Sequence, residues 1–136
     1  ADWQLAKAGG IGDDVTLHPL ILEPDRPWVY ERCDRRFEAM LEGGAIAEVE
    51  TLLARDLDPD LPVMRAIGVP EIAAYLDKTL SHEGMVAAGQ QATRNYAKRQ
   101  FTWFRRQPPP DWPRLQVWGE HENIAADDHF ASLLRI

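Results

Sequence analysis

The chain has 136 residues, of which 45% are hydrophobic and 27% are charged, and its formal net charge at pH 7 is -7. This composition is typical of one globular domain or a piece of one, and an acidic chain gains no general attraction to nucleic acid from its net charge. A single cysteine, Cys33, excludes an internal disulfide, and no apolar run approaches the roughly 20 residues that span a bilayer, so we expect a cytoplasmic protein without a membrane segment.

The beginning of the chain predicts one strand. Residues 1–14 are broken by glycines and lack periodicity, so we interpret them as a lead-in from an upstream part. Residues 15–22, VTLHPLIL, are apolar and β-branched and predict a buried strand, with Pro19 disturbing its middle. Because one strand cannot form a sheet by itself, we expect its partner strands to come from elsewhere.

Two helices are predicted next. Asp25 can cap the first one, Pro27 fits its first turn, and Gly43-Gly44 follows its last turn. The second helix begins after these glycines, and Pro59 and Pro62 then break the chain. Apolar residues at helical spacing define the inward faces, which are Val29, Cys33, Phe37, Met40 and Leu41 on the first helix and Ile46, Val49, Leu52 and Leu53 on the second.

The second half of the chain continues with further helices. Residues 63–68 predict a short turn or helix, and Pro70 can open another helix that runs through Leu80. Ser81 can cap a long helix that ends at Gln107, although two glycines weaken its first turns. The last predicted elements are a short strand over 114–118 and a helix over 123–134. The expected fold class is therefore mainly α, with one or two short strands.

One part of the long helix is strongly basic, and we refer to residues 92–107, ATRNYAKRQFTWFRRQ, as the basic strip. It holds five of the fifteen Lys and Arg residues, four aromatic residues and no acidic residue, while the other 120 residues carry ten basic and twenty-two acidic side chains. This local charge of +5 favours a contact with an anion. On a helical wheel the apolar stripe is Thr93, Ala97, Phe101 and Phe104, bordered by Arg94, Lys98 and Arg105 on one side and by Tyr96, Gln100 and Trp103 on the other, with Arg99 and Arg106 pointing further away.

Two interpretations of the basic strip remain open from the residues alone. Arginine binds phosphate through a planar fork of donors, and aromatic rings stack on unpaired bases, so the strip is suited to single-stranded RNA. Alternatively, its cations form salt bridges with acidic neighbours or face solvent, and Phe101, Trp103 and Phe104 pack in the core. The composition does not decide between them.

No complete active site is recognisable in the sequence. A GxxxxGK[ST] phosphate loop is absent, and adjacent carboxylates such as Asp13-Asp14 point in different directions. The histidines lack the spacing of a metal site. Cys33 lies on a helical apolar stripe, which favours a buried structural thiol over a nucleophile.

Four ordered blocks resemble those of one enzyme family. Residues 92–105 fit the pattern ATRxxAKRQxTWFR, which is similar to the signature near the end of bacterial tRNA dimethylallyltransferases, also called tRNA isopentenyltransferases. Residues 25–41 resemble the family's DRxxLYxRIxxRFxxML helix, 44–55 resemble its next helix, and 66–76 resemble its AIGYKExxxYL block. With Trp3-Gln4 at the start, the resemblance covers roughly Trp3 to Arg106.

The resemblance implies the transfer of a dimethylallyl group from dimethylallyl diphosphate to N6 of the adenosine 3′ of the anticodon (position 37) in tRNAs that read codons beginning with U. It also implies Mg²⁺ bound with the diphosphate, a monomeric full-length enzyme, and a P-loop-type α/β core with a helical insertion that holds the anticodon stem-loop. The target base leaves its stack for the reaction. Residues 15–136 are then expected to form the C-terminal part of the core domain, without the phosphate loop and the catalytic aspartate, and therefore to be inactive alone.

The resemblance also implies which residues contact tRNA. These are Arg65, Ala66, Ile67, Gly68, Val69 and Pro70 in a turn, and Arg94, Lys98, Arg99, Gln100, Phe101, Thr102, Trp103, Phe104 and Arg105 in the basic strip. No catalytic residue or metal ligand is expected in this chain. Val69 and Pro70 stand where the family usually has Tyr and a basic residue, so this chain departs from the family there. The alternatives are a stand-alone helical RNA-binding module and a protein-interaction domain whose basic strip pairs with its own acidic helices.

Overall fold

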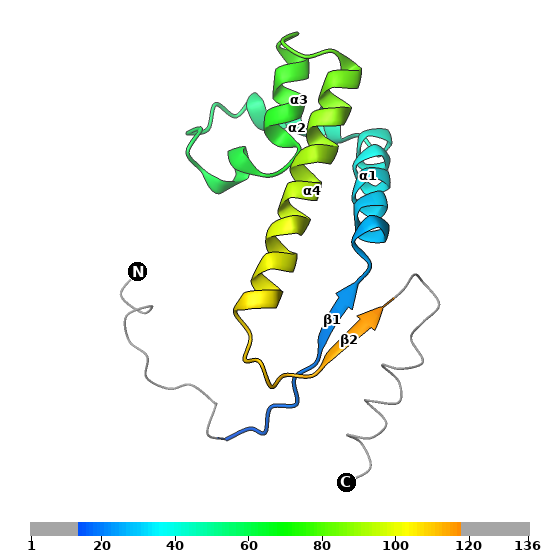
Figure 1. Cartoon of the computed structure of the whole chain (residues 1–136). Helices are drawn as coiled ribbons and strands as arrows, with labels where there is room; N and C mark the ends of the chain where they lie inside the picture. The colour runs from blue at the N-terminus through cyan, green and yellow to red at the C-terminus, as the bar shows by residue number, and fades with distance from the viewer. Residues whose placement is uncertain (1–13, 118–136) are drawn as a thin grey trace.

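The computed structural model describes residues 14–117. The elements in chain order are β1 (Ile21–Pro24), α1 (Arg26–Glu42), α2 (Ala45–Leu53), the 3-10 helix η2 (Pro62–Arg65), α3 (Val69–Leu76), α4 (His82–Arg106) and β2 (Arg114–Val117) (Figure 1). A mainly α fold with short strands, as predicted, is thus confirmed for these residues. Most of the predicted lead-in, Trp118 and the predicted helix over 123–134 lie outside the described residues.

β1 and β2 form a two-stranded parallel sheet, in which Ile21 lies opposite Arg114 and Pro24 opposite Val117. The Ile21 amide donates a hydrogen bond of 2.9 Å to the Pro113 carbonyl just before β2. The first strand was expected to take its partner strands from elsewhere, but one partner, β2, comes from the same chain.

The predicted strand over 15–22 is wrong in its extent and in its burial. Only Ile21–Pro24 forms a strand, and Ile21 is 4% exposed, whereas Val15 and Leu17 are 53% and 67% exposed. Pro19 has no amide hydrogen to donate to a ladder, and β2 is only four residues long. A strand that began before Ile21 would find no residue of β2 to pair with, because β2 begins at Arg114, opposite Ile21.

α1 begins and ends close to the predicted residues. The Trp28 amide donates to the Asp25 carboxylate at 3.1 Å, which satisfies one of the free donors of the first turn, and Pro27 lies in that turn. Phe37 is buried, as predicted for the inward face. Met40 is 43% exposed, so its predicted inward position is wrong.

The core joins three helices. Val49 of α2, Ile72 of α3 and Met85 of α4 are buried against one another, which confirms the predicted inward position of Val49. Each lies on the apolar side of an amphipathic helix, so burying them removes these side chains from water together. This cluster fixes the first half of α4 against α2 and α3.

α3 is shorter than predicted. It begins after Gly68, has Pro70 in its first turn and ends at Leu76 rather than Leu80. Lys78 has a φ of 61°, which lies in the left-handed region and cannot continue a helix. The amides of the next two residues donate to the Ala74 carbonyl at 2.9 and 3.1 Å, which closes the turn before α4.

α4 confirms the long predicted helix. The Ser81 hydroxyl accepts a hydrogen bond of 3.1 Å from the Gly84 amide, and the helix ends at Arg106, with Gln107 as its C-cap. The three prolines that follow lack the amide donors a helix needs. No helix within residues 14–117 is both long and apolar enough to cross a membrane.

α1 and α4 lie side by side (Figure 1). They approach closely at Gly89. Phe37 of α1 is 3% exposed, and a Cβ added at Gly89 would lie 2.0 Å from its Cζ atom. The same ring lies near Gly68, where an added Cβ would be 3.5 Å from Cε2. Gly89 therefore has a packing role that the sequence did not reveal, since it leaves room for the Phe37 ring.

Candidate nucleic-acid interface

The second half of α4 places cations on its outward face. Lys98, Arg99 and Thr102 line a shallow hollow of about 390 Å³ together with Asn95. Within residues 14–117 no carboxylate forms an ion pair with Lys98, Arg99 or Arg105. The Arg99 guanidinium instead lies 5.5 Å from the centre of the Tyr96 ring, as in a cation–π contact. This face therefore keeps positive charge available to an anion.

Two aromatic side chains next to these cations are exposed. Trp103 and Phe104 are 55% and 45% exposed, and their rings meet edge to face with centroids 4.9 Å apart. The interpretation that both pack in the core is therefore not supported in the described part of the chain. Phe101, in contrast, is half-buried. An exposed aromatic pair beside cations is suited to stacking on an unpaired base.

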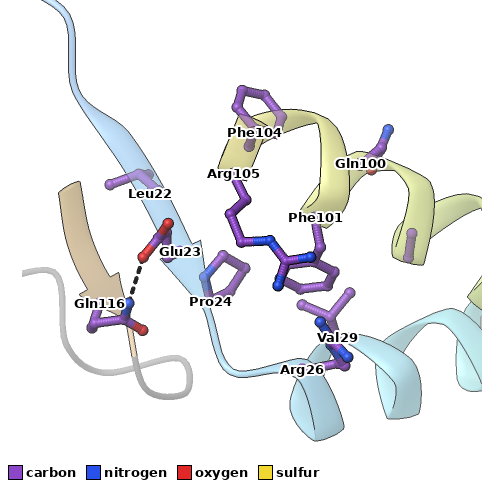
Figure 2. Close-up of a pocket in the computed structure, with 11 residues that line it drawn as sticks. Leu22, Glu23, Pro24, Arg26, Val29, Gln100, Phe101, Phe104, Arg105 and Gln116 are labelled. Carbon is purple, nitrogen blue, oxygen red and sulfur yellow. Dashed lines mark hydrogen bonds between the residues drawn. The ribbon is translucent and has the colours of Figure 1, made fainter. Parts of the chain in front are cut away.

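A cavity of about 330 Å³ lies between the end of α4 and the junction of β1 with α1. Figure 2 shows Phe101, Phe104 and Arg105 from α4 on one wall and Arg26 and Pro24 on the other. The Arg26 guanidinium lies 5.3 Å from the centre of the Phe101 ring. Arg26 thus brings a second guanidinium to the cavity that Arg105 lines. Arg26 was not among the residues expected to contact tRNA, although the Asp25-Arg26 pair that begins the second resembling block was a signal for it.

Arg114 ties the end of α4 to the sheet. Its Nη1 atom donates to the Glu23 carboxylate at 2.6 Å, and its Nη2 atom donates to the Phe104 carbonyl at 2.9 Å. Gln116 also donates to Glu23, at 2.5 Å (Figure 2). The hydrogen bond from Arg114 satisfies the Phe104 carbonyl, which lies in the last helical turn and has no partner within the helix. They hold Phe104 and Arg105 at a fixed place relative to β1.

The predicted tRNA-contacting turn has a defined shape. Gly68 has a φ of 100°, and its amide donates to the Glu71 carboxylate at 3.0 Å. A side chain at this φ would be strained, so the turn requires glycine. Arg65 forms an exposed ion pair with Asp60, and Ile67 is 38% exposed. The positive charge of Arg65 is therefore partly neutralised by Asp60 of the same chain.

The structure brings this turn next to α4. Ile67 of the turn lines a cavity of about 220 Å³ together with Thr93 and Tyr96 of α4. Lys98 and the residues after it continue along α4 from that point. Of the predicted tRNA-contacting residues, the exposed ones are Arg65, Ala66, Ile67, Pro70, Lys98, Arg99, Gln100, Trp103, Phe104 and Arg105, and the buried or half-buried ones are Gly68, Val69, Arg94, Phe101 and Thr102.

Arg94 differs from the rest of the cationic row. Its Nη1 atom donates to both oxygens of Asp34 on α1, at 2.5 and 2.7 Å. The two side chains are 25% and 31% exposed. For this one residue the structure shows the salt bridge that was the alternative to an RNA contact.

Cys33 lies on α1 beside this ion pair and is half-buried. Burial raises the pKa of its thiol, and the negative charge of Asp34 raises it further. A raised pKa lowers the thiolate fraction at any given pH, and the thiolate is the reactive form. At about pH 8 we therefore expect iodoacetamide to label Cys33 more slowly in the folded chain than in the chain unfolded in urea. Equal labelling rates in both states would contradict this expectation.

No metal centre is visible in the described residues. Among residues 14–117, no three His, Cys, Asp or Glu side chains are grouped so that they could hold a metal ion. A divalent cation needs several oxygen ligands around it. We therefore assign no metal ligand within this part of the chain.

Comparison with known proteins decides the family. The model of the family described as IPP transferase matches residues 2–107. The chain belongs to the IPP transferase family. Similar curated members are named tRNA dimethylallyltransferase: one from Erythrobacter litoralis is 70% identical over 118 residues, and one from Novosphingobium aromaticivorans is 61% identical over all 136 residues.

Solved structures of IPP transferases share the fold. The full-length tRNA isopentenylpyrophosphate transferase of Bacillus halodurans is 28% identical and superposes on 85% of this chain with a TM-score of 0.71. The tRNA delta(2)-isopentenylpyrophosphate transferase of Staphylococcus epidermidis is 26% identical, with a TM-score of 0.70. The chain spans 37% of each of these two chains, and 37% and 47% of the two curated relatives. The predicted fold class, a mainly helical part of a larger α/β fold, agrees with this match.

Proposed function

We propose that this chain is the tRNA-contacting, C-terminal portion of a tRNA dimethylallyltransferase. Residues 15–136 would form the C-terminal part of the core domain, after a lead-in over 1–14, in a monomeric cytoplasmic enzyme. The observation that carries the proposal is the second half of α4, where Lys98 and Arg105 have no carboxylate partner among residues 14–117 although the chain as a whole is acidic. The names of its relatives support the same substrate.

Each part of the interface has a distinct task in this proposal. Lys98, Arg99 and Arg105 bind backbone phosphates of the anticodon stem-loop, since positive side chains neutralise phosphate and release its counterions. Trp103 and Phe104 stack on an unpaired base, a contact worth roughly 1–3 kcal/mol per base. The turn that Gly68 shapes exposes Arg65 and Ile67, and Ile67 lies beside α4. These contacts bind and orient the tRNA, so that N6 of the flipped adenosine is presented to the dimethylallyl donor.

The chemical step would use groups of the upstream portion. A base there takes a proton from N6 while dimethylallyl transfers to that nitrogen and diphosphate leaves. Mg²⁺ bound with the diphosphate would stabilise the charge of the leaving group. This chain would supply the binding energy that holds the base in place.

Binding of an anticodon stem-loop RNA tests the proposal. We expect the chain to bind it with salt-dependent affinity, and we expect Lys98→Gln with Arg105→Gln to weaken binding roughly tenfold to a hundredfold. The loss of two phosphate contacts should reduce the magnitude of the negative slope of log affinity against log salt by about 1.4, at roughly 0.7 per contact. Fluorescence anisotropy at several salt concentrations measures both quantities.

A matched pair of substitutions serves as the control. Arg55→Gln with Lys78→Gln removes the same charge from exposed positions outside α4. We expect this control to leave the salt slope unchanged. Equal losses in the two double variants would mean that the RNA senses only net charge, which would contradict a specific interface on α4.

A further inference from the structure

We propose that Arg94 is a positioning residue of this interface and not an RNA contact. Its ion pair with Asp34 fixes the rotation of α4 against α1, so that Lys98 and the residues after it face the tRNA. This inference rests on the proposed tRNA-binding function and deepens it, because it separates residues that touch RNA from one that orients them.

The contacts of Arg94 occupy its terminal nitrogens. Nη1 donates to both Asp34 oxygens at 2.5 and 2.7 Å, and Nη2 donates to the Gln91 side-chain oxygen at 3.0 Å. The Arg94 and Asp34 side chains are only 25% and 31% exposed. A phosphate would have to displace the carboxylate, and the carboxylate repels it, so this position is unsuited to RNA.

Further contacts join the same two helices along their length. In the order of α4 they are Phe37–Gly89, Glu38–Gln90, Asp34–Arg94 and Arg26–Phe101. From Glu38–Gln90 to Arg26–Phe101 the residue numbers rise along α4 while they fall along α1, so the helices run antiparallel (Figure 1). Asp34–Arg94 lies between the tight packing at Gly89 and the cavity at Phe101. It is thus placed to set the rotation of the half of α4 that carries the exposed cations.

The rotation of α4 decides where Lys98 points. Lys98 follows Arg94 by four residues, so both lie on the same side of the helix, one turn apart. With side chains reaching roughly 5–6 Å from the helix axis, a rotation of about 30° moves a side chain by roughly 3 Å. A hydrogen bond to phosphate tolerates much less than this. A loosened α4 would therefore weaken every contact of the cationic face without removing any of its charges.

The substitution Asp34→Asn separates the two roles by the sign of its effect. If Arg94 touched RNA, removing Asp34 would free its guanidinium and take away a negative charge, and binding would tighten. As a positioning pair, the same change loosens α4, and we expect anticodon stem-loop binding to weaken roughly fivefold. The salt slope should stay unchanged, because no phosphate contact is lost. Glu31→Gln is the matched control, since it removes the same charge from an exposed site on α1.

A variant with the Asp34–Arg94 ion pair reversed provides a second test of the inference. We expect Asp34→Arg with Arg94→Asp to recover the parent affinity, since the ion pair is rebuilt with opposite polarity, whereas Arg94→Asp alone should bind weakly. All affinities are measured at a temperature at which circular dichroism shows each variant fully folded, so that unfolding does not contribute.

Each outcome has a defined meaning. Tighter or equal binding by Asp34→Asn would overturn the inference, and so would a reversed pair that regains thermal stability but not affinity, because Arg94 would then touch the RNA itself. Absence of salt-dependent binding by the parent chain would overturn the proposed function and this inference together. Binding that depends on Lys98 and Arg105 but not on Asp34 would overturn the inference alone.

Discussion

Fused to the upstream part of the Erythrobacter litoralis relative, this chain is expected to form isopentenyladenosine in tRNA, and alone it is expected to form none. The fusion replaces the region of the relative that this chain matches at 70% identity over 118 residues. The 136 residues contain no GxxxxGK[ST] loop, and residues 14–117 hold no grouped metal ligands. A GxxxxGK[ST] loop is the site expected to bind the diphosphate of the donor.

The measurement is mass spectrometry of nucleosides from tRNA incubated with dimethylallyl diphosphate and Mg²⁺. In the fusion, Lys98→Gln with Arg105→Gln should lower kcat/KM roughly tenfold to a hundredfold, mostly by raising KM. Contacts to phosphates far from the reacting nitrogen stabilise the bound substrate and the transition state equally. Arg55→Gln with Lys78→Gln is the charge-matched control here as well. Product formation by the chain alone would contradict the assignment of the chemical groups to the upstream part.

Gly89→Ala is expected to destabilise the chain by about 2 kcal/mol, although alanine favours helix over glycine by up to about 1 kcal/mol. The added Cβ would lie 2.0 Å from Phe37 Cζ and 2.4 Å from Cε1. Phe37 is 3% exposed and also lies near Gly68, so the ring has no free space to move into. Overpacking of this kind costs roughly 1–3 kcal/mol, and its upper range exceeds the helix-propensity gain. Thermal unfolding followed by circular dichroism should show a melting temperature lower by roughly 10 °C.

Gly84→Ala in the same helix is the control. Its added Cβ would be 3.4 Å from the Ser81 hydroxyl oxygen, which is ordinary contact, so we expect no loss of stability. Phe37→Leu should recover part of the loss in the Gly89→Ala background, because the two positions share one packing space. A Gly89→Ala variant as stable as the parent would mean that α1 and α4 are farther apart than the structure shows.

Local sequence features predicted the helices well. Asp25 and Ser81 cap their helices by accepting hydrogen bonds from amides three residues away, and proline ends α4 by removing donors, so these signals act within a few residues. The end of α3 was missed, because it depends on the left-handed backbone of Lys78, a residue type without that preference. The extent of β1 was missed because it depends on the length of β2, far along the chain.

The candidate site was predictable in position but not in detail. The charge and spacing of the basic strip located the exposed cations on α4, since both properties lie within one segment. The partner of Arg94 lies 60 residues away on α1, and nothing in the local pattern indicates it. The exposure of Trp103 and Phe104 likewise depends on which elements cover the end of α4, and not on their own apolar character.

The parallel pairing of β1 with β2 also has a kinetic meaning. Glu23 bonds to Arg114 and Gln116, which are 91 and 93 residues further along the chain, so the sheet closes a loop that contains every helix described above. Closing so long a loop costs chain entropy before it gains any contact, whereas helices form from neighbouring residues. The first half of α4 is therefore expected to become ordered with the other helices, and its last turn only when the sheet closes, so the two ends of α4 become ordered in separate steps of folding.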